Sequence, residues 1–344
     1  MREPAFWHRP PSWKAHLLRP LASLYGAVAA SRLLRKGIEA RIPVLCVGNY
    51  HGGGAGKTPA VLALAKILRE LGETPVVLSR GYGGRLHGPV MVQPLRHSAI
   101  DVGDEPLMLA RYVPVAVARD RIDGVALATS QGASVILMDD GFQNPAIAKD
   151  ASLIVIDSDR GIGNGYVIPA GPLRAPLARQ LDRTDALIVV GGGTASTSIA
   201  KTIASQPDKR VLSAHIQPDP ASVARLAGRR VLAFAGIGDP GRFFRTLRGA
   251  GIDVVRELTF PDHHPFSDGD IDALIAGAKR DELTLVTTEK DLARLRHHDN
   301  LPAWAQEIVP FHVTLAFDDG AALRTFLADR IYRAREKRFR GAQA

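Results

Sequence analysis

The sequence predicts an α/β fold with parallel sheets covered by helices on both faces. Apolar runs of strand length, rich in β-branched residues, recur along the chain. Helical stretches, for instance 59–71 and 121–131, lie between several of them. The runs are apolar throughout, as expected of strands that are buried on both faces of a sheet. A length of 344 residues suits about two domains, so we expect two such α/β/α units.

The predicted strands form two series, separated by a polar segment at 192–210 that is rich in Gly, Ser and Thr. The first series lies at 42–48, 75–79, 113–117, 134–138, 153–157 and 186–190. The second lies at 211–216, 231–236, 252–256, 283–287 and 308–315, followed by a helix at about 319–338. We therefore predict a first α/β domain over 41–208 and a smaller α/β domain with a basic C-terminal helix over 209–344.

Positive charge is concentrated at the two ends of the chain. The 44 Lys and Arg residues outnumber the 35 Asp and Glu residues and give a net charge of +9. Residues 1–41 hold eight basic and two acidic residues, and residues 330–340 hold six basic and one acidic, so the middle of the chain is near neutral. A near-neutral middle argues against a nucleic-acid groove. The single cysteine, Cys46, excludes a disulfide framework and a Cys-rich zinc site.

Residues 1–40 are predicted to form a basic, amphipathic, membrane-associated segment. An uncharged run lies between Arg19 and Arg32 and has apolar residues at helical spacing. The run is shorter than the roughly 20 apolar residues that cross a bilayer. It suits a helix lying in the interface, with its cations on anionic head groups. The alternative is a helix packed on the protein body, which small residues such as Gly26 and Ala29 would permit. For the basic C-terminal tail, membrane binding and simple solvation are equally open.

A glycine-rich loop at 48–58, GNYHGGGAGKT, connects the first strand to a helix that Pro59 is expected to open. Such a loop points backbone N–H groups at a phosphate chain. Lys57 would neutralise the β- and γ-phosphates, and the Thr58 hydroxyl would hold Mg²⁺. His51 stands where the strict motif has glycine, so the loop is a variant. The predicted nucleotide-binding residues are Gly53, Gly54, Gly56, Lys57 and Thr58.

Paired carboxylates follow or precede other predicted elements. Asp139 and Asp140 end the strand at 134–138, and the carboxyl end of a parallel strand is where a metal–nucleotide site is expected. Asp104 and Glu105 precede a helix and are candidates for a base and a metal ligand. The alternatives are an Asp-Asp-Gly turn and ordinary acidity at a helix N-terminus.

Polar groups after further strands are candidates for substrate contacts. The segment SRGYGG at 79–84 offers the cation of Arg80 and the aromatic ring of Tyr82. A long Gly/Pro-rich loop ends at Arg174. His263 and His264 lie in a tight turn whose spacing is not that of a helical zinc pair.

The segment 288–291, TEKD, reads as a helix N-cap in which Thr288 pairs with Asp291. That structural interpretation accounts for it without any role in catalysis.

In their order along the chain, these motifs resemble the tetraacyldisaccharide 4′-kinase family, the lipid A 4′-kinases of Gram-negative envelope synthesis. The motifs are GNYHGGGAGKTP, SRGYGG, VGDEP, DDGFQ, GNGYVIPAGPLR, FPDHH and TEKD, and the resemblance extends to about residue 295. It implies two P-loop-like α/β domains with the active site between them, and ATP and Mg²⁺ as cofactors. It implies transfer of the γ-phosphate to the 4′-hydroxyl of an acylated glucosamine disaccharide 1-phosphate. It also implies a peripheral enzyme on the cytoplasmic face of the inner membrane, and no obligate protein partner is evident.

The same resemblance implies roles for individual residues. Asp104 matches the base and His263 the histidine that assists it, although the motif does not decide between His263 and His264. The implied catalytic set is Asp104, His263, Lys57 and Arg174. The implied metal ligands are Thr58, Glu105, Asp139 and Asp140. The implied substrate-binding residues are Arg80, Tyr82, Arg121 and Gln143. The family often has an acidic residue after the GPLR arginine, where this chain has Ala175, so no metal or salt-bridge role is assigned there.

Two other classes of protein share parts of this pattern. A P-loop GTPase or ATPase that acts as a switch at the membrane surface shares the glycine-rich loop but has no need of the DHH and GPLR segments. A nucleic-acid-binding protein would use the basic ends as arms, which the near-neutral middle of the chain does not favour.

Overall fold

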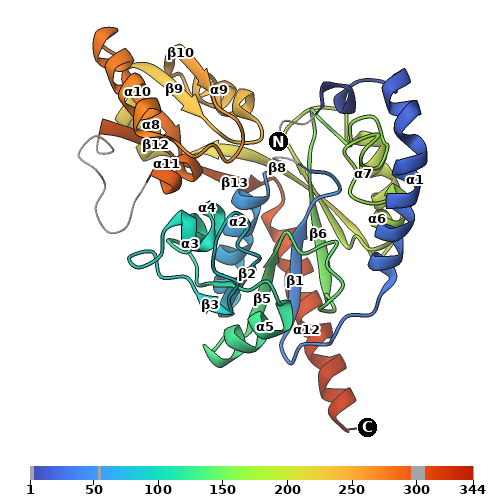
Figure 1. The fold of residues 1–344 in the computed structure, drawn as a ribbon. Helices are drawn as coiled ribbons and strands as arrows, with labels where there is room; N and C mark the ends of the chain where they lie inside the picture. Colours follow the sequence, from blue (N-terminus) through green and yellow to red (C-terminus); the bar gives the residue numbers. More distant parts are fainter. Residues whose placement is uncertain (1–3, 53–55, 296–306, 344) are drawn as a thin grey trace.

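The structure is a computed structural model that describes residues 4–52, 56–295 and 307–343. In this part of the chain the strands form a nine-stranded sheet and a four-stranded sheet (Figure 1). We call the nine-stranded sheet with its helices the large lobe and the four-stranded sheet with its helices the small lobe. The predicted α/β class is confirmed.

The large sheet has the order β13-β8-β7-β6-β1-β5-β2-β4-β3. Its inner pairs are parallel, and its edge strands β3 and β13 are antiparallel to their neighbours. The strands are β1 (Val44–Gly48), β2 (Pro75–Ser79), β3 (Val90–Met91), β4 (Val115–Val117), β5 (Val135–Asp139), β6 (Ala151–Asp157), β7 (Ala186–Val190), β8 (Arg210–Pro218) and β13 (Val313–Phe317). Every residue of β1, β2, β5 and β6 is buried, as predicted from their continuous apolar runs.

Helices cover both faces of the large sheet. Helix α2 supplies Leu64 and α12 supplies Leu327 to the core on one face. Helix α5 supplies Ala128 and α7 supplies Ile203 to the core on the other. The helical elements of this lobe are η1 (Ala5–His8), α1 (Trp13–Leu34), α2 (Lys57–Glu70), α3 (Ala99–Val102), α4 (Asp104–Leu109), α5 (Arg121–Ser130), α6 (Leu177–Asp182), α7 (Thr197–Ala204) and α12 (Gly320–Gln343).

The small sheet is parallel throughout and has the order β10-β9-β11-β12. Its strands are β9 (Arg230–Ala235), β10 (Asp253–Thr259), β11 (Thr284–Thr288) and β12 (Ile308–Phe311). Its helices are α8 (Pro220–Leu226), α9 (Pro240–Gly249), α10 (Asp268–Arg280) and α11 (Glu289–Leu295). Phe244 of α9 packs in the core on one face, and Leu274 of α10 packs in the core on the other.

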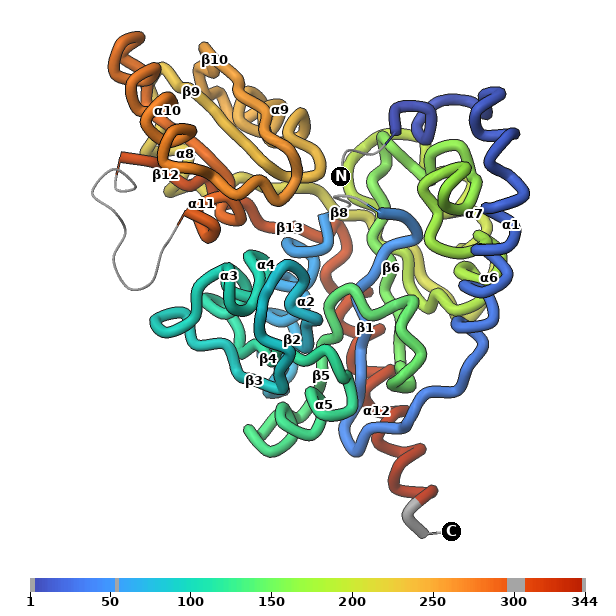
Figure 2. The backbone as a smooth tube through the Cα atoms, in the orientation of Figure 1, coloured from blue at the N-terminus to red at the C-terminus, as the bar shows by residue number. Residues whose placement is uncertain are grey.

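Two chain segments connect the lobes, and both differ from the sequence prediction. The predicted strand 308–315 is two strands, β12 and β13, which lie in different sheets and are separated by His312. The expected division after residue 208 does not follow the sheets, because β8 pairs with β7 inside the large sheet. The chain therefore leaves the large lobe after β8 and returns to it at β13, as the course of the tube shows (Figure 2). How the chain divides into independently folding domains stays a prediction.

Helix α1 packs on the body through small residues and leaves its large apolar residues exposed. Ala15, Ala22 and Gly26 are buried, and a side chain on Gly26 would contact Pro176. On the opposite side of the helix, four large side chains are 59–71% exposed: Trp13, Leu17, Leu21 and Leu24. No helix in the described ranges is both long enough and apolar enough to cross a membrane.

Candidate active site

A cavity of about 1090 Å³ lies between the lobes and extends to the flank of α1. Every site residue predicted from the sequence lines it, apart from Gly53 and Gly54, which lie outside the described residues. The lining residues from that set are Gly56, Lys57, Thr58, Arg80, Tyr82, Asp104, Glu105, Arg121, Asp139, Asp140, Gln143, Arg174 and His263. The structure therefore brings Arg121 and residues from six separate sequence motifs to one place.

The phosphate-loop end of this cavity is formed where β1 leads to α2. Gly56 is the N-cap of α2 and has φ 87°, a left-handed conformation that glycine adopts at no steric cost. Helix α2 begins at Lys57, so the prediction that Pro59 opens it is two residues late. The predicted end is confirmed, because the helix finishes at Glu70 and Gly72 follows in a left-handed conformation.

Asp140 gathers two cations beside the N-terminus of α2. Its Oδ1 atom lies 3.1 Å from Lys57 Nζ and 2.8 Å from Arg174 Nη1. Burial raises the pKa of Asp140, but the charges of Lys57 and Arg174 outweigh it and hold the pKa well below the ordinary value. Asp140 therefore stays ionised. In this arrangement its carboxylate binds two cations of the protein and is not positioned as a metal ligand.

Thr58, Glu105 and Asp139 form the part of the cavity that suits a divalent cation. The Thr58 hydroxyl donates a hydrogen bond to Glu105 Oε1. Asp139 is 2% exposed, and its Oδ1 has no hydrogen-bond partner among the described residues. Burial, together with the charges of Glu105 and Asp140, raises the pKa of Asp139 well above its ordinary value. A cation bound here would supply the partner that this carboxylate lacks.

This donor set fits Mg²⁺ that arrives with a nucleotide better than a metal held by protein alone. Within the described ranges, no group of three or more His, Cys, Asp or Glu side chains is placed to hold a metal ion. Mg²⁺ usually keeps several waters and takes one or two carboxylates together with substrate phosphates. Two carboxylates and a hydroxyl meet that requirement.

Arg121 and Gln143 also line the cavity. Arg121 begins α5, is 3% exposed, and has no hydrogen-bond partner for Nε among the described residues. Burial lowers the pKa of Arg121, and the charge of Asp139 opposes that shift. Gln143 Nε2 donates to the Asn49 carbonyl at 2.9 Å, and Gln143 Oε1 accepts from Arg174 at 3.2 Å. Gln143 therefore connects the phosphate loop to Arg174 through two hydrogen bonds.

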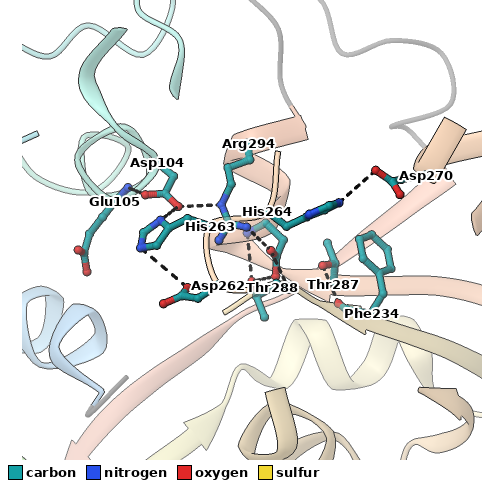
Figure 3. A network of polar contacts seen from close by, with 12 residues as sticks. Asp104, Glu105, Phe234, Asp262, His263, His264, Asp270, Thr287, Thr288 and Arg294 are labelled. Atoms are coloured by element: carbon teal, nitrogen blue, oxygen red, sulfur yellow. Dashed lines mark hydrogen bonds and ion pairs between the residues drawn. The ribbon is translucent and has the colours of Figure 1, made fainter. Parts of the chain in front are cut away.

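Asp104 lines the cavity next to Glu105, and side chains of the small lobe contact it there (Figure 3). It is the first residue of α4, is 5% exposed, and accepts a hydrogen bond from the Glu105 N–H on Oδ1 at 2.8 Å. Its Oδ2 atom accepts from Arg294 Nε at 2.7 Å and lies 3.0 Å from His263 Nδ1. Asp104 belongs to the large lobe and its two partners belong to the small lobe, so this contact exists only when the lobes are close.

The two adjacent histidines have different partners. His263 points at Asp104, whereas His264 points away and lies 3.1 Å from Asp270 Oδ2 (Figure 3). His264 also stacks on Phe260, with ring centroids 4.9 Å apart. The structure therefore places His263, and not His264, at the carboxylate.

Tyr82 and Arg80 lie at the rim of the cavity beside this pair. The Tyr82 ring is 73% exposed, and its centroid is 5.5 Å from that of His263. Arg80 is also exposed. Both side chains are accessible to a bound substrate.

Sequence reasoning missed Arg294, which fixes the position of Asp104. Thr288 Oγ1 donates to Asp291 Oδ2 at 2.7 Å and accepts from the Asp291 N–H at 3.1 Å, so the predicted N-cap is confirmed. The other oxygen of Asp291 accepts from Arg294 Nη1 at 2.8 Å, and Asp291 is fully buried. The available signal was the three-residue spacing of Asp291 and Arg294 on one helix, which is common on protein surfaces.

The charges around Asp104 set its protonation. Burial raises the pKa of Asp104, but the hydrogen bond with His263 and the charges of Lys290 and Arg294 hold it well below the ordinary value. Burial also lowers the pKa of Lys290, but Glu105, Asp104 and Asp262 outweigh that effect and raise it. Asp104 is therefore an anion and Lys290 a cation at neutral pH.

Comparison with known proteins finds relatives over nearly the whole chain. The family model for tetraacyldisaccharide-1-P 4′-kinase matches residues 14–332. A tetraacyldisaccharide 4′-kinase of Bradyrhizobium diazoefficiens is 67% identical over 339 residues, which are 98% of this chain and 99% of that protein. One from Rhodopseudomonas palustris is 63% identical over 344 residues and covers 100% of both. The structure of LpxK from Aquifex aeolicus in complex with ATP matches with a TM-score of 0.70 and 26% identity, over 92% of this chain and 99% of that one.

Proposed function

Because the chain belongs to the tetraacyldisaccharide 4′-kinase family, we propose that the cavity between its lobes is the site of phosphoryl transfer. The enzyme transfers the γ-phosphate of ATP to the 4′-hydroxyl of a tetraacyldisaccharide 1-phosphate in lipid A biosynthesis. The observation that carries the proposed site is its arrangement. The N-terminus of α2 with Lys57 and a fixed carboxylate, Asp104, line the same cavity.

The end of the cavity at α2 is proposed to bind the phosphates of ATP. The N–H groups at the N-terminus of α2 and the Lys57 ammonium group favour negative charge there. Lys57 and Arg174 both contact Asp140 in this structure, so both cations are oriented before the nucleotide arrives. Phosphoryl transfer depends on this positioning and charge neutralisation more than on covalent chemistry.

Thr58, Glu105 and Asp139 are proposed to hold Mg²⁺ together with phosphate oxygens. Bound there, the cation would neutralise charge on the phosphates. Asp140 supports this set from one side by fixing Lys57.

Asp104 is proposed to accept the proton of the attacking hydroxyl. The hydroxyl oxygen forms a bond to the γ-phosphorus while the bond from that phosphorus to the bridging oxygen breaks, and the electron pair stays on the ADP formed. The low pKa of Asp104 keeps it ready to accept a hydrogen bond and makes it a weak base, so the proton moves late. His263 orients the carboxylate from the small lobe.

The size and the lining of the cavity favour an acceptor that stays partly in the membrane. A volume of about 1090 Å³ accommodates a nucleotide and a sugar head group, but not four acyl chains as well. The cavity reaches Tyr25, Val28 and Arg32 of α1, whose outer face is apolar and exposed. We propose that α1 lies in the membrane interface on the cytoplasmic face of the inner membrane, next to the acyl chains.

A switch GTPase or ATPase is not favoured by the relatives, which are named as kinases over the whole chain. A switch protein also has no use for the acceptor-hydroxyl site that we propose at Asp104 and His263.

The deciding experiment is incubation with γ-labelled ATP, Mg²⁺ and a tetraacyldisaccharide 1-phosphate in detergent. We expect a labelled lipid, and no product with Lys57→Ala. Lys66→Ala is the matched control, because Lys66 lies exposed on the same helix. Hydrolysis of ATP without a labelled lipid would support the switch protein instead.

A further inference from the structure

The first turn of α9 extends an arginine from the small lobe toward the phosphate loop of the large lobe. Arg242 is the third residue of this helix, and its N–H donates to the N-cap residue Asp239 at 3.1 Å. Its Nη2 atom forms an ion pair with Asp157, the last residue of β6. Its Nη1 atom faces Gly56, since a methyl group placed on Gly56 would lie 3.4 Å from it.

From the large lobe, Asp157 pairs with the guanidinium group. Its side chain is 2% exposed, and its Oδ1 accepts from the N–H groups of Asp159 at 2.7 Å and Arg160 at 3.0 Å. Its Oδ2 atom pairs with Arg242. Because β6 is the direct neighbour of β1 in the sheet, this carboxylate lies beside the strand that leads to the phosphate loop. The ion pair uses Nη2 and leaves Nη1 directed at the end of α2.

We propose that Arg242 donates through Nη1 to the phosphate chain of ATP bound at the N-terminus of α2. The inference rests on the proposed kinase function. A planar guanidinium group with several donors is able to keep its bond to Asp157 and bind a phosphate oxygen at the same time. As the bond between the γ-phosphorus and the bridging oxygen breaks, negative charge moves onto that oxygen. Arg242 stabilises this charge, while the proton of the attacking hydroxyl passes to Asp104.

The origin of Arg242 gives it a function that Lys57 and Arg174 do not have. Those two cations come from the large lobe and contact Asp140 there. Arg242 comes from the small lobe, as His263 does, so it reaches the phosphates only when the lobes are close. Closure then completes the site at both of its ends, which restricts transfer to the closed form.

The competing interpretation is that Arg242 only fastens the lobes together through Asp157. The two interpretations predict different effects of changing Asp157. A fastening contact is lost equally when either partner is changed. A phosphate contact is lost only when Arg242 is changed. Asp157→Asn removes the charge of the pair but keeps a side-chain oxygen for the N–H groups of Asp159 and Arg160.

The test compares Arg242→Ala, Arg242→Lys, Asp157→Asn and the double variant Arg242→Ala/Asp157→Asn. Arg245→Ala is the matched control, an exposed arginine on the same helix. We expect Arg242→Ala to lower kcat by about 10²–10³-fold, as for loss of one donor to transition-state charge. We expect Asp157→Asn to stay within about threefold of the wild type. Titration with ATP and with AMP is the readout that does not depend on turnover, and Arg242→Ala should weaken ATP binding and leave AMP binding unchanged.

Equal losses in Arg242→Ala and Asp157→Asn that do not add in the double variant would show a fastening contact and overturn the inference. Unchanged ATP binding and turnover in Arg242→Ala, with wild-type protein that phosphorylates the lipid, would also overturn it and leave the kinase function intact. If the wild type makes no labelled lipid, the proposed function fails, and the ATP and AMP titrations still decide where Arg242 binds. If Arg242→Ala unfolds, Arg242→Lys, which keeps the charge but not the planar donors, decides by the same measurements.

Discussion

At the scale of single residues, the site depends on one carboxylate that is buried, charged and held by two small-lobe side chains. Asp104 makes three hydrogen-bonding contacts at 2.7–3.0 Å, to Glu105, Arg294 and His263. A buried carboxylate stays ionised only where such partners offset the loss of water. The same partners fix its direction, which matters because a proton acceptor has to lie within hydrogen-bond reach of the attacking hydroxyl.

Asp104→Asn should lower turnover by about 10²–10⁴-fold, the usual contribution of a general base. The change keeps the shape of the side chain and removes the proton acceptor, so KM for ATP should change little. Steady-state kinetics at saturating ATP measure this. The two histidines give a matched comparison: His263→Ala should slow the enzyme, and His264→Ala should not, because only His263 contacts Asp104. Near-normal turnover in Asp104→Asn would exclude the proton-acceptor role.

Arg294→Gln should move the acid limb of the pH–rate profile to higher pH. Burial raises the pKa of Asp104, while His263, Lys290 and Arg294 hold it low, so removal of the Arg294 charge lets it rise. Since the proposed proton acceptor Asp104 functions only when ionised, the variant should lose activity at a higher pH than the wild type does as the pH falls. Profiles of kcat for the wild type and the variant over pH 3–9 measure the difference, and the variant should lose activity at the acid end of this range before the wild type does.

A lower rate with an unmoved profile would mean that Arg294 acts only on the position of the carboxylate. Arg280→Gln is the matched control, because Arg280 lies exposed in the same lobe.

At the scale of elements, α1 has two different faces. Its buried residues are small, so the helix lies close to the body, and its large apolar residues lie on the opposite side. The sequence suggested both a packed helix and a membrane-facing helix, and the structure contains the geometry for each on different faces. A helix whose large residues were buried would leave no apolar surface for a membrane.

Leu21→Glu and Leu24→Glu should each weaken binding to vesicles that contain anionic lipid. Placing a charge on the apolar face removes buried area and adds repulsion from the head groups. Ser23→Glu is the control, because Ser23 is exposed on the flank of the same helix. This substitution adds the same charge outside the apolar face. Co-sedimentation with vesicles measures binding, and thermal unfolding should be the same for all three variants. Equal loss in all three would point to net charge instead of the apolar face.

Several cations of the basic C-terminal helix α12 form ion pairs with acidic residues elsewhere in the protein. Arg338 makes two contacts to Asp150, at 2.8 and 3.0 Å, and donates to the carbonyls of Ala40 and Ile42 at 2.7 and 3.1 Å. Arg335 pairs with Glu73 at 2.6 Å, and Lys337 pairs with Glu39. These contacts hold the helix against the segment that precedes β1. They support neither membrane binding nor simple solvation, the two interpretations drawn from the sequence.

Arg338→Ala should lower the free energy of unfolding by about 3 kcal/mol, because it leaves the largely buried Asp150 carboxylate without its cation. Asp150 also accepts from the Val44 N–H at 2.8 Å, so the disturbance reaches the first strand of the sheet. Arg340→Ala, which removes an exposed pair with Glu336, should cost less than about 0.5 kcal/mol. Urea unfolding of both variants makes the comparison, and similar costs would show that the Arg338 contacts are not special.

At the scale of the whole molecule, the parallel sheet explains which parts of the site were predictable. Lys57 comes after strand β1, and Asp139 is the last residue of β5. Because β1 and β5 are parallel neighbours, both residues lie at the same carboxyl end of the sheet. Arg242 and Arg294 were not predicted, because a single arginine on a helix usually lies on the surface. The split at His312 was not predicted either, since the sheet that a strand joins depends on pairings distant in sequence.

The connection between the lobes contains a histidine whose protonation should affect the free energy of unfolding. His312 lies between β12 and β13, with Nδ1 2.8 Å from Glu289 Oε1, and Tyr112 of the large lobe donates to the same carboxylate. The hydrogen bond with Glu289 raises the pKa of His312 above its ordinary value near 6.5, burial opposes the rise, and Asp219 adds to it. A raised pKa in the folded protein means that folding favours the protonated ring.

The stabilisation from His312 is therefore complete below about pH 6.5 and is lost as the pH rises through the raised pKa. His312→Gln should lower the free energy of unfolding at pH 6, by up to about 1 kcal/mol for this partly exposed pair, and should have less effect at pH 9. Urea unfolding of both proteins at the two pH values measures the difference. His215→Gln is the control, because His215 lies in an exposed pair with Asp318 within the large sheet. A cost for His312→Gln that grows with pH would mean that the neutral ring, and not the charged one, stabilises the meeting of the lobes.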